Sequence, residues 1–334
     1  MSNGNQLGHS PPTGTPTGTP TDTGTATATV NDIVNSSSGG ASSREAGRGV
    51  VSAASVRSDL RFFANELRVT FFRRRNQLLL LVTALFPLLI GIGLKLSAPH
   101  GRGGGGGPSS SGAAYFSQLA GNGVFLTFVA LSLLLILVLP VVVGVVSGDS
   151  IAGEAGYGTL RYLLAVPAGR TRLLAVKYAA IVVWAVAATF VVSVIALVVG
   201  VALFGAGPVT LLSGTTVSLA DGLVHVLWVT LYVCAAMAAF GAIALAISTF
   251  TEHAIGAIAA AMIIVVASEV VDNIPQFGPA APYFPTHWWL SFDSLLRTPV
   301  DTTTLWHGLL SFAVYAALFL AIAWARFTSA DVTS

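Results

Sequence analysis

The stretch that decides the fold of this chain is Gly148–Lys177, with the sequence GDSIAGEAGYGTLRYLLAVPAGRTRLLAVK. It carries acidic and basic residues, whereas the flanking residues 118–148 and 178–220 contain no Asp, Glu, Lys or Arg. About 20 consecutive apolar residues suffice for an α-helix to cross the roughly 30 Å of hydrocarbon in a bilayer. The pattern therefore predicts two membrane-spanning helices joined by a charged loop.

The composition of the whole chain is typical of a membrane protein. Of its 334 residues, 54% are hydrophobic and 9% are charged, against roughly 25% charged residues in an ordinary globular domain. The mean hydropathy is +0.79. Continuous apolar segments favour helices over the alternating strands of a membrane barrel, so the predicted fold class is an all-α membrane protein. Six spanning helices are expected, at residues 77–97, 123–147, 173–204, 223–249, 253–271 and 305–326.

Basic residues predict the orientation of these helices, because loops that stay in the cytoplasm retain an excess of Lys and Arg. If the N-terminus is cytoplasmic, only Lys95, Arg102 and Arg297 of the 16 Lys and Arg residues fall on the outer side. An even number of spans then returns the C-terminus to the cytoplasm. We therefore predict an N-in/C-in topology, and we attribute the net charge of +2 to this bias and not to nucleic-acid binding.

Three regions outside the spans have their own composition. Residues 1–55 are rich in Thr, Gly, Ser and Pro, with too little apolar surface to offset the entropy of ordering, so we expect a disordered cytoplasmic tail. Residues 56–76 place apolar side chains at helical spacing beside three arginines, which is typical of an interfacial amphipathic helix held by anionic headgroups. A plain extension of the first span is the alternative. Residues 327–334 are expected to form a short cytoplasmic tail.

Within the charged loop, the residues after Gly158 predict a short helix. Thr159 can cap its first turn, and Leu160 and Leu163 share one face. Pro167 cannot continue this helix without the loss of a backbone hydrogen bond. An amphipathic helix of this kind, parallel to the membrane, offers an apolar knob to a soluble partner. The alternative is a solvated loop whose basic residues only set the topology.

The segment between the fifth and sixth spans, residues 271–304, is the second unusual region. Its five prolines prevent one continuous helix, and its aromatic residues favour the headgroup layer. We expect short external or re-entrant helices that form a lid, with an aromatic belt around the sixth span as the alternative. The candidate outer-vestibule residues are Glu269, Asp272, Trp288 and Trp289. The alternative is that the carboxylates of Glu269 and Asp272 are only solvated near the membrane interface and have no role in a vestibule.

The charged loop also carries three motifs that, in combination, resemble one family. D-x-I-A-G-E lies at 149–154, G-T-L-R-Y-L-L-A-x-P at 158–167 and R-x-R-L-L-x-x-K at 170–177. Together they resemble the membrane-spanning subunits, or permeases, of ABC-2 type transporters. The six spans, the amphipathic helix and the long loop agree with this resemblance over residues 56–326, with residues 77–326 as the permease domain.

The resemblance implies that the loop after the second span is a cytoplasmic coupling helix, which sits in a groove of an ATP-binding subunit. The residues carried over to this contact are Asp149, Glu154, Gly158, Thr159, Leu160, Leu163, Pro167 and Arg170. Lys177 would anchor the next span at the inner membrane surface. The resemblance further implies two permeases, expected to be identical, with two ATP-binding subunits in the plasma membrane. They would export a substrate by alternating access.

No G-x-x-x-x-G-K-[ST] phosphate loop occurs in the sequence. ATP and Mg²⁺ are therefore expected on the partner chain, and no catalytic, cofactor-binding or metal-ligating residue is assigned to this one. The rival hypothesis is a membrane-embedded transferase or hydrolase that uses Asp149 and Glu154 at the inner membrane surface. A proton-coupled carrier or channel is a third hypothesis, although the span interiors carry almost none of the ionisable groups that it needs.

Overall fold

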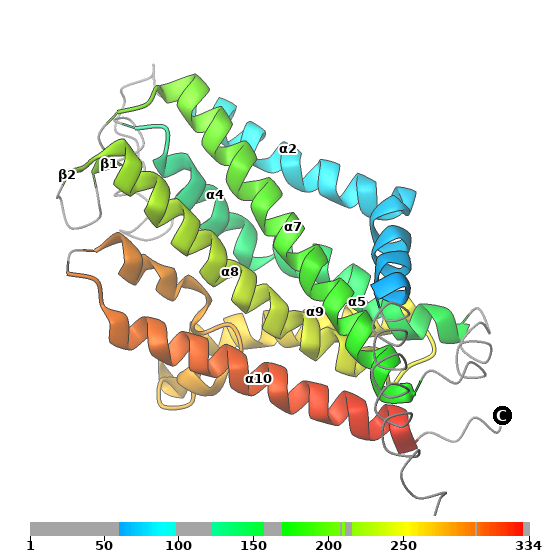
Figure 1. Ribbon diagram of the computed structural model, residues 1–334. Coiled ribbons are helices and arrows are strands. Elements are labelled where there is room, and N and C mark those ends of the chain that lie inside the picture. The colour runs from blue at the N-terminus through cyan, green and yellow to red at the C-terminus, as the bar shows by residue number, and fades with distance from the viewer. Residues whose placement is uncertain are drawn as a thin grey trace, which may run out of the picture. The chain divides into compact units, whose positions relative to one another are not determined.

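The computed structural model describes residues 60–97, 122–156, 169–207, 209–210, 216–297 and 299–329. The predicted tail at 1–55 and residues 157–168 of the charged loop lie outside these ranges. The long helices are α2 (Arg74–Ser97), α4 (Phe125–Ile136), α5 (Val138–Gly156), α7 (Arg170–Phe204), α8 (Leu219–Ser248), α9 (Ala254–Asp272) and α10 (Thr302–Ser329) (Figure 1). A further helix covers residues 60–72.

The remaining elements are short. They are the paired antiparallel strands β1 (Val209–Thr210) and β2 (Thr216–Val217) and the 3-10 helices η2 (Pro275–Phe277), η3 (Ala281–Tyr283) and η4 (Trp289–Leu296). Over the ranges that the structure describes, six helices are long and apolar enough to cross a membrane, namely α2, α5, α7, α8, α9 and α10. The predicted all-α fold with six such helices is confirmed.

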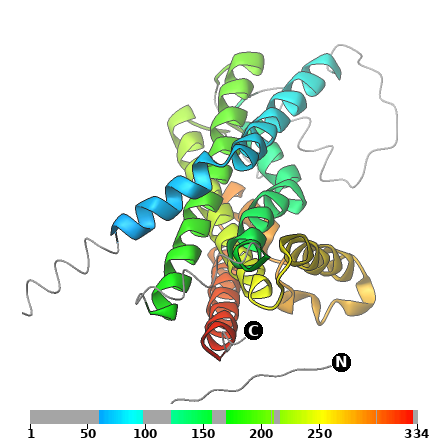
Figure 2. The ribbon, with the colours of Figure 1, turned by 90° about the vertical axis from the view of Figure 1, so that its right-hand side faces the viewer.

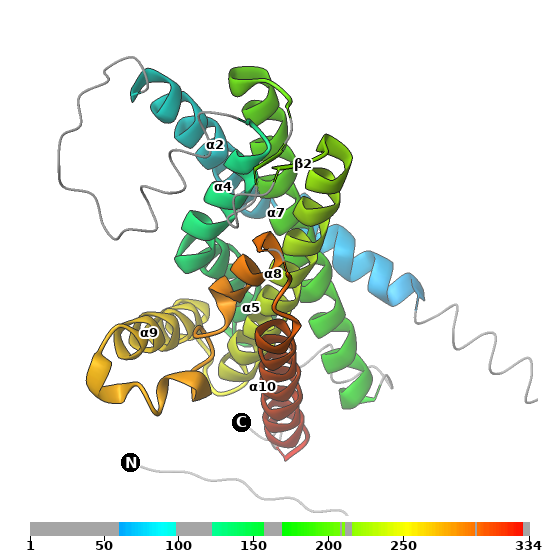
Figure 3. The same ribbon diagram turned by 90° about the vertical axis from the view of Figure 1, so that its left-hand side faces the viewer.

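Helix α8 is the centre of the bundle. In its most apolar window 78% of the residues are buried, against 17% in α2 and in α10 and 22% in α9. Helices α5, α7 and α10 pack against α8. Figures 2 and 3 show α2 and α9 on separate flanks. The exposed faces of the outer helices are apolar, and hydrocarbon chains are as apolar as the side chains that they would contact there.

The second predicted span, residues 123–147, is interrupted in the structure. Leu137, between α4 and α5, has a φ of −136° and a ψ of −50°, outside the α-helical region. Pro140 explains the interruption, because it has no amide hydrogen to donate to the carbonyl of Ile136 and its ring crowds that carbonyl. The expectation of one continuous helix is therefore wrong at this point.

Helices α5 and α10 run further than predicted. The expected ends were Ser147 and Arg326, where the apolar runs stop, but α5 ends at Gly156 and α10 at Ser329. The change from apolar to polar side chains marks where a helix leaves hydrocarbon, and backbone hydrogen bonds continue through polar residues. Residues 327–329 are consequently helical, and the predicted tail at 327–334 begins with the last turn of α10.

The helix over residues 60–72 is separated from α2 by a bend at Arg73, where Figure 1 shows the chain changing direction. The side-chain amide of Asn76 donates to the carbonyl oxygen of Thr70 across this bend, at 2.8 Å. Phe71 packs edge-on against Trp184 of α7, with ring centroids 5.2 Å apart. The bend is thus tied both to α2 and to the interior of the bundle.

The start of α2 and the end of α10 lie at one end of the bundle, which we call the charged end. Helices α5, α8 and α10 end there, and α2, α7 and α9 begin there (Figure 1). Trp324 Nε1 of α10 donates to Thr171 Oγ1 of α7 at 3.0 Å. The guanidinium carbon of Arg326 lies 5.7 Å from the ring centre of Phe250, just after α8.

The segment between α9 and α10 contains the short helices η2, η3 and η4, as its prolines predict. Helix η4 packs against α8 and α10. Its residues Trp289, Phe292 and Leu296 are buried in the core, and Trp289 meets the ring of Phe240 edge-on at 6.0 Å. The segment therefore folds back into the bundle. Its predicted use as a lid stays a prediction.

Candidate functional site

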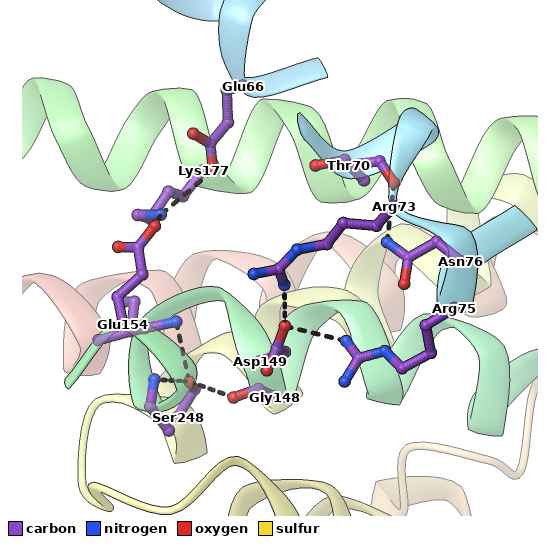
Figure 4. A network of polar contacts seen from close by, with 12 residues as sticks. Glu66, Thr70, Arg73, Arg75, Asn76, Gly148, Asp149, Glu154, Lys177 and Ser248 are labelled. Carbon is purple, nitrogen blue, oxygen red and sulfur yellow. Dashed lines mark hydrogen bonds and ion pairs between the residues drawn. The ribbon is translucent and has the colours of Figure 1, made fainter. Parts of the chain in front are cut away.

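Six ionisable side chains meet at the charged end and form what we call the ion-pair cluster (Figure 4). Its members are Glu66, Arg73, Arg75, Asp149, Glu154 and Lys177. They come from the helix at 60–72, the bend and start of α2, the end of α5 and the start of α7. Acids and bases are equal in number, so the cluster is close to neutral and joins segments that are far apart in sequence.

Asp149 of α5 lies between two arginines. Its Oδ2 accepts from Nη2 of Arg75 at 2.9 Å and also from Nη1 of Arg73. The bend between the helix at 60–72 and α2 is what places both guanidinium groups over α5. The Asp149 side chain is 10% exposed, but the arginine side chains are 46% and 49% exposed. Solvent therefore screens these pairs, and each is worth about 1 kcal/mol or less.

Lys177 of α7 is the buried member of the cluster. Its Nζ donates to Oε1 of Glu154 at 2.7 Å and to Oε1 of Glu66 at 3.1 Å, and its side chain is 1% exposed. A buried ammonium group persists only where acidic partners compensate for its lost hydration. The lysine thus ties α7 to α5 and to the helix at 60–72. This placement differs from the expected anchor at the membrane surface, because the side chain points into the bundle.

The ion-pair cluster lines a small cleft between the helix at 60–72, α2, α5 and α7. The other residues of its wall are Val69, Thr70, Asn76, Val146, Ser150, Ala180 and Ile181. On the arginine side of the cluster the two basic side chains are half exposed, whereas on the other side the basic group, Lys177, is buried. The arginine pairs can therefore break and re-form at little cost, and the contacts of Lys177 form the fixed side of the cluster.

The structure brings two of the predicted loop residues into this cluster, Asp149 and Glu154. Arg170 is the first residue of α7, and only its backbone is described. The other predicted contact residues lie outside the described ranges, and they are Gly158, Thr159, Leu160, Leu163 and Pro167. The structure thus fixes the two helices from which the predicted coupling segment departs and to which it returns.

Four members of the cluster were not selected from the sequence as site residues: Glu66, Arg73, Arg75 and Lys177. A signal was available, because apolar spans leave few charges, and charges of opposite sign near span ends tend to pair. Both acids and bases occur next to the first three spans, which permits such pairing. The pattern could not say which acid meets which base, because that depends on the packing of α7 between α2 and α5.

Two members of the predicted outer-vestibule set lie close together. Oδ1 of Asp272, at the end of α9, lies within hydrogen-bond distance of Nδ1 of His287. The ring of Trp288 meets the imidazole of His287 edge-on, with centroids 4.8 Å apart, and its centroid lies 5.8 Å from that of the imidazole of His307. His287 is thus the residue that connects Asp272 with Trp288.

The other two members of that set lie elsewhere. Glu269 is one turn before Asp272 on α9 and is half-buried. Trp289 points into the core against Phe240 of α8, away from solvent. The four residues therefore do not line one common wall. Their role in substrate passage stays a prediction.

The chemistry of the cluster gives no support to the enzyme hypothesis. Asp149 and Glu154 each accept hydrogen bonds from basic side chains, which hold them as ion-pair partners. Within the described part of the chain, no group of three or more His, Cys, Asp and Glu side chains is arranged to hold a metal ion. What the arrangement can do is mechanical, because it connects a loop to three helices.

Comparison with known proteins agrees with this description. A family described as ABC-2 family transporter protein matches residues 72–268, more than half of the chain. The match begins at the bend before α2 and ends near the end of α9, so it includes the arginines of the cluster, Asp149, Glu154 and Lys177. No curated protein shows significant similarity to the chain.

Proposed function

We propose, from the premise that this chain belongs to the ABC-2 transporter family, that it forms the membrane-spanning part of an ATP-driven exporter. Membership makes it a multi-pass transport permease. The energy source, the direction of transport and alternating access are our proposal. ATP and Mg²⁺ would bind to a separate subunit, because the sequence lacks a phosphate loop.

The observation that carries this proposal is the position of the ion-pair cluster at both ends of the loop 157–168. Glu154 lies just before the loop and Lys177 two turns after it, and their side chains bond at 2.7 Å. Lys177 also bonds to Glu66 of the helix at 60–72. A push on the loop by a partner subunit would therefore reach three helices together, as rigid-body movement of packed helices requires.

The proposed assembly contains two copies of this chain and two ATP-binding subunits. The charged end would face the cytoplasm of the plasma membrane, since basic residues concentrate there. Leu160 and Leu163 would then fill a groove on the ATP-binding subunit, with Gly158, Thr159 and Pro167 shaping the loop. Arg170 would sit at its exit into α7.

The test is copurification with the ATP-binding protein encoded next to this chain, and the variant to compare is Leu163→Glu. We expect this change to abolish copurification, because it would place a charge in an apolar groove. His253→Glu is the matched control, since His253 is exposed at the same end but outside the loop. Loss of the complex in both variants, or in neither, would contradict docking through the loop.

A topology experiment tests the orientation separately. Single cysteines at positions 163 and 253 are introduced into a Cys234→Ala background and labelled in intact cells with a membrane-impermeant thiol reagent. Both positions should be protected in intact cells and should react after the membrane is opened. Labelling of position 163 from outside would overturn both the orientation and the docking proposal.

A further inference from the structure

We infer that Ser248, the last residue of α8, is a positioning residue that locks the end of α5 to the turn between α8 and α9. The inference rests on the proposed function, because it states how movement at the end of α5 would reach the rest of the bundle. Ser248 belongs to none of the three motifs in the charged loop, and it lies about 100 positions after the α5 residues that it contacts.

The hydroxyl of Ser248 contacts one hydrogen-bonding pair of backbone groups in α5. Its Oγ donates to the carbonyl of Gly148 at 2.8 Å and accepts from the amides of Ala152 at 2.9 Å and Ile151 at 3.3 Å (Figure 4). In an undisturbed α-helix the carbonyl of residue 148 and the amide of residue 152 bond to each other. A single side chain of α8 therefore contacts the acceptor and the donor of one hydrogen-bonding pair in α5.

Two glycines bring the same stretch of α5 against the turn and the start of α9. A Cβ atom on Gly148 would lie 2.7 Å from Cγ1 of Ile258 in α9. A Cβ atom on Gly156 would lie 2.9 Å from the carbonyl oxygen of Glu252 in the turn. The stretch 148–156 thus meets the turn region at both of its ends, with the contact of Ser248 between them.

The two sides of this stretch are held by different chemistry. On one side Asp149 forms ion pairs with two arginines that are half exposed, so water can replace those contacts, while Glu154 pairs with the buried Lys177 of α7. On the other side Ser248 has an exposed fraction of 0%, and no water can replace its three hydrogen bonds. When the end of α5 moves, it should therefore keep its contacts with α8 and α9, and the exposed contacts between Asp149 and the arginines should yield first.

A matched serine is present on α9. Ser268 is also buried, but its hydroxyl donates to the carbonyl of Ile264 in its own helix, at 2.7 Å. Removal of that hydroxyl breaks no hydrogen bond between helices. Ser268→Ala therefore controls for the loss of a buried hydroxyl as such, and Ser248→Thr controls for the site while it keeps the hydroxyl.

The test is a distance measurement by double electron–electron resonance in a Cys234→Ala background. Spin labels are placed at position 155, near the end of α5, and at position 255, an isoleucine that is strongly exposed at the start of α9. The permease is measured alone in lipid nanodiscs, and again with its ATP-binding subunit and ATP plus vanadate. Ser248→Ala should fold, because the amide of Ala152 and the carbonyl of Gly148 are partners of one α-helical hydrogen bond, so no buried group is left unpaired.

We expect one narrow distance in the wild type, in Ser248→Thr and in Ser268→Ala, unchanged by nucleotide. Ser248→Ala should lose this narrow distance and give a broad distribution. A narrow distance in Ser248→Ala, or a broad one in Ser248→Thr, would overturn the inference. Broadening in Ser248→Ala together with failure of any ATP-binding subunit to dock would support the role of Ser248 and overturn the proposed function.

Discussion

The two ends of the bundle are held together in different ways. At the charged end, long side chains join α2, α5 and α7 through the ion-pair cluster. At the opposite end the same part of the bundle relies on backbone contact, because a Cβ atom on Gly200 of α7 would lie 1.9 Å from the carbonyl oxygen of Gly123. The amide of Gly123 also donates to the carbonyl of Gly205 at 3.1 Å, next to the end of α7.

The difference indicates where movement is possible. Backbone groups in direct contact have no side-chain torsion angles with which to follow a shift, so we expect the glycine end to act as a fixed point. Arginine side chains have several rotatable bonds and half of their surface in solvent, so they can follow a shift of Asp149. Under the proposed function, we therefore expect the helices to rock about the glycine end.

The largest expected effect comes from Lys177→Met. This change leaves the carboxylates of Glu66 and Glu154 facing each other without their cation. The free energy of unfolding in mixed micelles should fall by about 3–5 kcal/mol, as for other buried ion pairs that lose one partner. The triple variant Lys177→Met, Glu66→Gln, Glu154→Gln should recover most of the loss. Equal stability of the single variant and the wild type would show that the lysine is not the fixed side of the cluster.

The next effect concerns the opposite end. Gly200→Ala places a methyl group against backbone atoms that cannot turn away, so we expect a loss of about 1–3 kcal/mol, typical of overpacking. Gly93→Ala on α2 is the control, since a Cβ atom there meets no heavy atom within 4 Å. Denaturant titrations would compare the free energy of unfolding of the two variants. Similar stability in the two would remove the argument for a rigid glycine end.

A smaller effect is expected for Asp149→Asn, which removes the charge shared by Arg73 and Arg75. Because these pairs are half exposed, the loss of stability should be about 1 kcal/mol and should shrink in high salt. The penalty of Lys177→Met should depend much less on salt. Unfolding at low and high ionic strength compares the two variants, and an equal salt dependence would mean that both sides of the cluster are solvated alike.

The smallest effect is a pH dependence at the start of α10. Asp301 caps this helix by accepting from the amides of Thr303 and Thr304 at 3.1 Å and 3.3 Å, and it also accepts from the hydroxyl of Thr304. Hydrogen bonds to the charged form, first that of the Thr304 side chain, lower the pKa of the Asp301 carboxyl below its ordinary value.

The sign of this dependence follows from the lowered pKa. The cap stabilises the folded state above the ordinary carboxyl range, and the contribution disappears as the pH falls through the lowered pKa. The Tm difference between the wild type and Asp301→Ala should therefore be small but positive at neutral pH and should vanish in strong acid. A difference that grows on acidification would contradict the cap.

The sequence predicted the spans well because the thickness of the bilayer sets their length, whatever their neighbours are. It placed Asp149 and Glu154 at the site because they belong to a motif. It did not predict their partners, because Lys177 reaches Glu66 only once α7 packs beside the bend at Arg73. The sequence shows Pro140, but the helix ends were predicted from hydropathy alone. Hydropathy does not change at a proline within an apolar run, so the break in the helix was missed.

The extension of α5 to Gly156 affects how a force on the charged loop would be transmitted into the membrane. Helices α4 and α5, of 12 and 19 residues, together measure at most about 46 Å at 1.5 Å per residue. Hydrocarbon accounts for only about 30 Å of that length. If α4 starts at the opposite face of the hydrocarbon, the last turns of α5, which carry Asp149 and Glu154, would project past the lipid as a stiff arm. A force on the end of this helix would rotate the part of the helix inside the bilayer, whereas a flexible loop at the same place would not transmit the force.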